Sequence, residues 1–218
     1  MQLTLSKALI NLVAFMGLIS TNIAIAEEKH NHHIHQHKKV STISEQIIDL
    51  MHKPMMQTPF LESDNLDLNF ISNMIPHHQG AIDASEMLLK HSKNQRVRAQ
   101  AQAIIKEQKA EIKEFESLIP QLQEQKKLYS PKEVTLFNNQ AKTDMEAMMK
   151  AMNETKLHNR IDYDFLSSMI PHHQGAIDAS KQILQYTQNE QIKTIAKHII
   201  QTQEKEIETF KTILKNIR

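Results

Sequence analysis

A segment of twelve residues occurs twice in this chain, and no other feature constrains the fold as strongly. The letters MIPHHQGAIDAS occupy positions 74–85 and again positions 169–180. Residues 70–119 align with residues 165–214 at a constant offset of 95 without a gap, yet only nine of the 34 positions after the segment match. Packing tolerates exchanges among apolar residues of similar size, so identity confined to one segment indicates a role beyond packing.

Each copy has the periodicity of a helical hairpin. Apolar or small residues recur at helical spacing through the segment, and polar residues fill the opposite face, which is the pattern of an amphipathic helix. A break follows near Ser92, where Asn94 is a suitable N-cap, and the next apolar series is expected to end at Pro120. Because a short connection makes neighbouring helices antiparallel, we predict an all-α fold. The predicted architecture is a ferritin-like four-helix bundle built from two duplicated helical hairpins, with extra Met-rich helices preceding each repeat.

The N-terminal residues have the form of a secretory signal peptide. Lys7 precedes an apolar run from Ala8 to Ile19, and small residues near Ala26 form a cleavage site. An uncleaved membrane anchor is the alternative, although the run is short for a bilayer span. We expect cleavage after Ala26 and a periplasmic location. The chain then divides into a signal peptide (1–26), a His-rich disordered tail (27–43), a first repeat with its Met/His segment (44–119), a linker (120–143) and a second repeat with its Met-rich helix (144–218).

The exported chain is expected to carry no net formal charge, and it has no cysteine. Of the 26 Lys and Arg residues only Lys7 lies in the signal peptide, which leaves 25 basic residues against 25 acidic ones. This balance gives no electrostatic reason to expect nucleic acid or, after cleavage, a membrane as the partner. Without thiolate, a site for a soft metal must use thioether or imidazole, and the chain has 12 Met and 13 His residues.

The repeated segment places a thioether beside two imidazoles. Met74 lies three residues before His77 and four before His78, so the three side chains share one face of a helix. The second copy repeats this arrangement with Met169, His172 and His173. Both pairs of His lie within the apolar stripe and are expected to be buried, where each ring nitrogen needs a partner. Metal ligation would satisfy one nitrogen of each ring.

Polar residues on the second helix of each hairpin are the candidates to form hydrogen bonds with the ring nitrogens that do not bind metal. They are Gln108, Glu111, Gln203 and Glu206, and all four positions match across the repeat. The alternative is a set of Gln, Glu and His side chains that hydrogen-bond one another in the core with no metal.

Pro76 and Pro171 interrupt the two helices that carry the motifs. A proline inside a helix removes one backbone hydrogen bond and kinks the helix, which would aim Met and His at a shared site. Alternatively, the helix restarts at this point with the proline in its first turn.

Three further clusters contain candidate ligands. Each cluster has a simpler interpretation as well. The two Met clusters could be Met-filled stripes that pack on the core, and the His-rich tract could be a solvated spacer. As metal ligands, the Met clusters suit Cu(I) or Ag(I), and the tract suits Cu(II), Ni(II) or Zn(II). The clusters are Met51, His52, Met55 and Met56; Met145, Met148, Met149 and Met152; and His30, His32, His33, His35 and His37.

The segment MIPHHQGAI on a helix, followed by Gln-x-x-Glu-Ile on the next, closely resembles a family catalogued as a domain of unknown function, DUF305. Its members look like exported ferritin-like helical proteins, and some are described as CopM-type periplasmic copper metallochaperones. The resemblance covers both repeats and implies copper or silver binding through the Met and His residues of the two motifs and the Met residues upstream. This chain departs from the family at Ala84 and Ala179, where the family commonly has Met. It also departs after Gln-x-x-Glu-Ile, where the family commonly places Met and Trp and this chain has Phe115/Leu118 and Phe210/Ile213.

We therefore expect a periplasmic protein that binds Cu(I) or Ag(I), with Cu(II) as a further candidate, and that buffers copper, confers resistance or hands the ion on. Copper is the expected bound metal, silver its surrogate, and no organic cofactor is expected. The expected partners are metal ions and a periplasmic copper exporter or copper acceptor protein. No catalytic residue is assigned. A ferritin-like di-iron oxidase is one alternative, but its Glu-x-x-His motif occurs in the exported chain only at Glu27–His30. The other alternative is a metal-free helical scaffold for interaction or stress.

Overall fold

The computed structural model describes residues 41–125 and 128–217, which form six α-helices and no strand. This confirms the predicted all-α class. The predicted signal peptide and the His-rich tract from His30 to His37 lie outside the described residues. The helices are α1 (Ile43–Gln57), α2 (Leu66–His91), α3 (Gln95–Glu124), α4 (Pro131–Asn153), α5 (Ile161–Ile183) and α6 (Glu190–Asn216).

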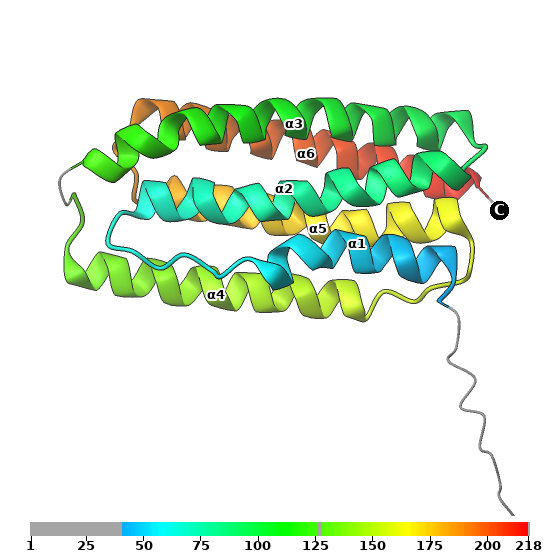
Figure 1. The fold of residues 1–218 in the computed structure, drawn as a ribbon, viewed down its shortest axis with the longest axis horizontal. Helices are drawn as coiled ribbons and strands as arrows, with labels where there is room; N and C mark the ends of the chain where they lie inside the picture. Colours follow the sequence, from blue (N-terminus) through cyan, green and yellow to red (C-terminus); the bar gives the residue numbers. More distant parts are fainter. Residues whose placement is uncertain (1–40, 126–127, 218) are drawn as a thin grey trace, which may run out of the picture. The chain divides into compact units, whose positions relative to one another are not determined.

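The helices are arranged in three layers, with α2 and α5 in the middle (Figure 1). α2 packs against α3, and α5 packs against α6, so each motif helix forms a hairpin with the helix that follows it. The two hairpins meet through α2 and α5, whereas α3 and α6 touch only sparingly. On the opposite side α1 covers α2 and α4 covers α5. The helices that carry the motifs are therefore enclosed on several sides.

The close packing of α1 on α2 depends on a glycine within the motif. A Cβ atom at Gly80 would overlap the backbone carbonyl oxygen of Met51 on α1. At the equivalent position on α5, a Cβ at Gly175 would overlap the Met148 side chain of α4. Both motif glycines thus let an outer helix approach the middle layer more closely than any other residue would allow.

The connection before each motif helix is held by a buried polar side chain. Asp164, which is fully buried, accepts hydrogen bonds from the backbone N–H groups of His158 and Arg160, both at 2.9 Å, and from Ser44 Oγ at 2.6 Å. Asn69, 95 residues earlier, accepts from the backbone N–H of Ser63 at 2.9 Å. These bonds satisfy backbone groups that burial would otherwise leave unpaired.

Helix boundaries confirm some sequence predictions and correct others. Asn94 caps α3 through its side chain, as predicted. The prediction that Pro120 ends this helix is wrong, because α3 continues to Glu124. The exposed position of Glu116 lets water satisfy the carbonyl that loses its partner, and buried Leu122 holds the extra turn against the core.

Much of the segment from 120 to 143, interpreted as a linker, is also helical. α4 begins at Pro131, where Ser130 and Glu133 form a capping box and the proline occupies the first turn. The alternative in which a helix restarts at Pro76 or Pro171 is likewise wrong, since both prolines lie in the interior of continuous helices. Within the described residues, no helix is long and apolar enough to cross a membrane.

Candidate metal centre

The middle layer buries all six residues of the repeated motifs. A spacing of three and four residues places each Met and its two His on one side of the helix. The six are Met74, His77 and His78 on α2 and Met169, His172 and His173 on α5.

The first histidines of the two motifs meet where α2 crosses α5. The ring centroids of His77 and His172 are 3.8 Å apart, with an interplanar angle of 34°. His77 Nε2 lies 3.1 Å from the backbone carbonyl oxygen of His172, so this nitrogen carries the hydrogen and donates it. The other nitrogen of His77, Nδ1, has no hydrogen-bond partner, and neither does either nitrogen of His172. Because a buried polar atom without a partner is costly, these nitrogens indicate a place for a ligand.

The second histidines face the outer helices of their own hairpins. His173 Nε2 forms a hydrogen bond of 2.9 Å with Glu206 Oε2. His78 Nε2 lies 2.8 Å from Glu111 Oε2, but this contact lacks hydrogen-bond alignment. Both imidazoles keep an Nδ1 atom that has no partner.

The two glutamines expected to hydrogen-bond the histidine rings form no hydrogen bond with them. Gln108 and Gln203 are each only 2% exposed, and both side-chain amide atoms of each lack a hydrogen-bond partner. The polar interior is therefore incompletely satisfied on both hairpins.

Burial keeps the central imidazoles neutral. Loss of solvent is the main cause that holds the pKa of His77 well below its ordinary value, and the neighbouring rings of His78 and His173 add to it. The pKa of His172 is lowered in the same way, first by burial and then by the rings around it. His52 on α1 also has a pKa lowered by burial, and its Nε2 atom has no partner. A neutral imidazole is the form that binds a metal ion.

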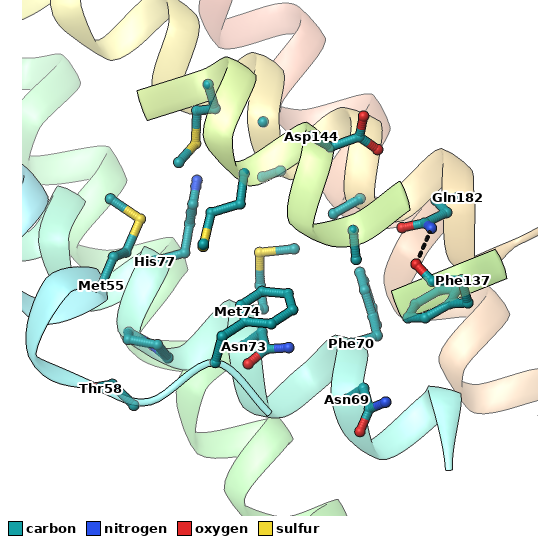
Figure 2. Close-up of a pocket in the computed structure, with 18 of the residues that line it drawn as sticks. Met55, Thr58, Asn69, Phe70, Asn73, Met74, His77, Phe137, Asp144 and Gln182 are labelled. Carbon is teal, nitrogen blue, oxygen red and sulfur yellow. Dashed lines mark hydrogen bonds between the residues drawn. The ribbon is translucent and has the colours of Figure 1, made fainter. Parts of the chain in front are cut away.

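A cavity of about 80 Å³ adjoins the first motif. Its wall includes His77 and four methionines from three helices, which are Met55 on α1, Met74 on α2, and Met145 and Met148 on α4. Figure 2 shows Met55, Met74 and His77 around this space. A water molecule needs only roughly 10–15 Å³ measured in this way, so the cavity has room for a single metal ion.

The cavity wall is mostly uncharged. Its amide side chains include Gln182, which donates a hydrogen bond of 2.8 Å to the Phe137 carbonyl oxygen (Figure 2). Asp144 supplies a carboxylate, which accepts a hydrogen bond of 2.7 Å from Gln140. Neutral sulfur and nitrogen donors suit a soft monovalent ion better than a hard divalent one.

The second motif contributes small residues to the same cavity, among them Gly175 and Ala176, but neither its methionine nor its histidines line it. Met169 is fully buried in the hydrophobic core, together with Met51 and Met152. The two motifs are therefore identical in sequence but different in environment.

The remaining candidate ligands are placed in different ways. Met149 is partly buried and packs against the core. Met56 is 72% exposed and does not line the cavity. The residues of the His-rich tract lie outside the described residues.

One cluster of potential ligands was not found by sequence reasoning. Glu107, Glu111 and His198 each place a ligand atom within 4.8 Å of the others across α3 and α6. The hydrogen bond that His198 donates to Glu107 is the main cause that raises the pKa of His198. Two of these residues lie on outward helix positions, so the amphipathic pattern gave no signal for them.

A family model described as "Domain of unknown function (DUF305)" matches residues 67–214, which include both motif helices and both of their hairpin partners. The chain belongs to the DUF305 family. No curated protein sequence matches it.

Solved structures similar to this DUF305 chain are also helical proteins of the same family or of the CopM type. A DUF305 fragment from Deinococcus radiodurans shares 24% identity at a TM-score of 0.51, covering 70% of this chain and 97% of the fragment. CopM in a silver-soaked form shares 27% identity at a TM-score of 0.52, covering 69% of this chain and 95% of CopM. CopM in a Cu(II)-bound form shares 26% identity at the same TM-score, with 69% and 96% covered.

Proposed function

We propose that this DUF305 protein binds one Cu(I) or Ag(I) ion in the cavity beside the first motif. The observation that carries the proposal is the gathering of four thioethers and one neutral imidazole on one cavity wall. Thioether and imidazole are the soft and borderline ligands that Cu(I) prefers. The chain has no cysteine that could compete for the ion.

The arrangement of the donors favours exchange over permanent retention. Met55, Met145 and Met148 come from α1 and α4, which cover the middle layer from one side only. Methionine side chains are flexible and adapt to different positions. A site of this kind suits buffering or handover of copper, and we assign the protein to that role, without catalysis.

Similarity to CopM supports the choice of metal. CopM has been solved in a silver-bound form and in a Cu(II)-bound form, and this chain has the same fold over most of its described length. The predicted signal peptide supports a periplasmic location for this role. The partner for handover would be a copper exporter or a copper acceptor protein.

Thermal unfolding with Ag(I) tests the site in the full chain. The test variant is Met74→Leu/Met148→Leu, which removes two thioethers from the cavity at nearly constant volume. The matched control is Met56→Leu/Met87→Leu, which removes two thioethers that do not line it. A ligand present at about 100 times its dissociation constant stabilises the folded state by about 2.7 kcal/mol, which corresponds to roughly 5–10 °C for a protein of this size.

We expect the control to keep the full silver-induced shift and the cavity variant to lose most of it. Both variants keep the His-rich tract, so silver bound there contributes equally to each, and the difference between the two shifts reports on the cavity. Equal shifts in the two variants would refute the proposed site. Transfer of Cu(I) from the protein to a chromophoric chelator, followed by stopped flow, then tests handover. Metal-free protein isolated from copper-fed cells would instead support a helical scaffold.

A further inference from the structure

A second group of ligands lies on the opposite side of the middle layer from the thioether cavity. Glu107 and Glu111 are one turn apart on α3, and His198 faces them from α6. His198 Nε2 is 2.7 Å from Glu107 Oε1. The side chains of Glu107 and His198 are 39% and 52% exposed, whereas that of Glu111 is 6% exposed. The group thus reaches from solvent to the core.

Glu111 distinguishes this group from an ordinary surface ion pair. Its carboxylate lies 2.8 Å from His78 Nε2 without hydrogen-bond alignment, although it is almost completely buried. In the other hairpin, Glu206 makes an aligned hydrogen bond with His173. A nearly buried carboxylate that makes no aligned hydrogen bond with its nearest imidazole, and that faces a second imidazole and a second carboxylate, can take a cation as its partner.

The offset of 95 residues provides an internal comparison. It relates Glu107 to Thr202, His198 to Ala103 and Glu111 to Glu206. Two of the three ligands are therefore absent from the equivalent place on the other half of the chain. The group is specific to one side and does not follow from the motif itself.

We propose that Glu107, Glu111 and His198 bind one borderline divalent cation, with Zn(II) as the reference ion. Two carboxylates and one imidazole form a three-ligand set that Zn(II) uses, with water as a fourth ligand. Two carboxylates also balance the charge of a divalent ion. The thioether cavity lacks such a pair, so the two sites differ in the class of metal they select.

The bound cation would join the two hairpins. α3 and α6 touch only sparingly in the described structure, and the three ligands come from both helices. A metal that links them stabilises the folded state and favours the packed arrangement of the outer layer.

Zn(II) alone, added to the full chain, tests the proposal through thermal unfolding and titration calorimetry. The site variant is Glu107→Gln/His198→Ala, which changes two exposed or half-exposed side chains. The matched control is Glu116→Gln/His91→Ala, which makes the same two kinds of change at exposed positions away from the site. A third variant, Ala103→His/Thr202→Glu, adds the missing ligands beside Glu206.

We expect Zn(II) to raise the unfolding temperature of the wild type and the control. The site variant should lose that shift and its affinity for the stabilising ion should fall at least about tenfold. The third variant should bind a second stabilising Zn(II) ion. An unchanged zinc-induced shift in the site variant would overturn the proposal. The silver-induced shift should be the same in the wild type and the site variant, so failure of this site is distinguishable from failure of the thioether cavity.

Discussion

Acidification should destabilise the metal-free protein through the two central histidines. The folded state holds the pKa of His77 and of His172 well below the ordinary value of 6.5. In the unfolded chain both imidazoles regain solvent and titrate near that value. Below it the unfolded state binds more protons than the folded state, so the free energy of unfolding falls as the pH falls.

The magnitude follows from the number of buried rings. Each imidazole that stays neutral in the folded state costs about 1.4 kcal/mol for each pH unit below its unfolded pKa. Between about pH 7.5 and about pH 5.5, the two rings together should reduce the free energy of unfolding by about 3 kcal/mol. That is a substantial part of the roughly 5–15 kcal/mol that holds a typical protein folded.

Two other groups act in the opposite direction. Burial raises the pKa of Asp67, and the hydrogen bond that His198 donates to Glu107 raises the pKa of His198. Each of these groups binds its proton more readily in the folded state, so acidification through its titration range favours folding. Burial lowers the pKa of His52 as well, so this group adds to the loss. The change in the wild type alone is therefore a sum, and a variant is needed to isolate the central imidazoles.

Urea unfolding of the wild type and of His172→Leu, in chelator at both pH values, provides that comparison. Asp67 and His198 are unchanged in the variant, so the difference in pH dependence reports on His172. We expect the variant to lose about 1.4 kcal/mol less on acidification than the wild type. His91→Leu, which replaces an exposed histidine at the end of α2, should retain the wild-type dependence. Equal losses in the wild type and His172→Leu would show that this imidazole is not buried in its neutral form.

Three further predictions concern the folded framework and can be checked by urea unfolding. Gly80→Ala should destabilise the protein by about 1–3 kcal/mol, because the new methyl group overlaps the rigid carbonyl of Met51. Gly175→Ala should cost less, because its methyl group meets the flexible Met148 side chain. Equal costs for the two variants would contradict this difference. Ser130→Ala should lower stability by about 1 kcal/mol through loss of the capping box of α4, and no change would mean that the cap is not formed in solution. Asp164→Ala should cost about 3 kcal/mol or more, because it leaves three donors without their acceptor; a cost below about 1 kcal/mol would show that water replaces the carboxylate.

The repeated hairpins were predictable because they depend on local patterns. Apolar residues at helical spacing define the buried faces of α2 and α5, and short polar breaks define the turns. Asn94 and Asn189 cap α3 and α6 with their side chains, which follows from the same local chemistry. These features involve residues close together in the chain, where spacing alone places side chains on a common face.

Predictions failed where a local rule met tertiary packing. Pro120 is a strong local signal for a helix end, but burial of Leu122 outweighs the loss of one solvated hydrogen bond. The capping box at Ser130 and Glu133 was present in the sequence as a start signal for α4. It was missed because the polar composition of that segment favoured a linker.

The sequence by itself determined the class of fold, the inward position of the Met and His residues, and the availability of soft ligands without cysteine. These follow from helical periodicity and composition. Only the tertiary structure decided that two identical motifs have different environments, since Met74 lines a cavity while Met169 is packed in the core. It also decided that Glu107 and His198 meet, 91 residues apart. The physical reason is that these contacts depend on residues outside the twelve-residue segment, and the two halves of the chain differ at those positions.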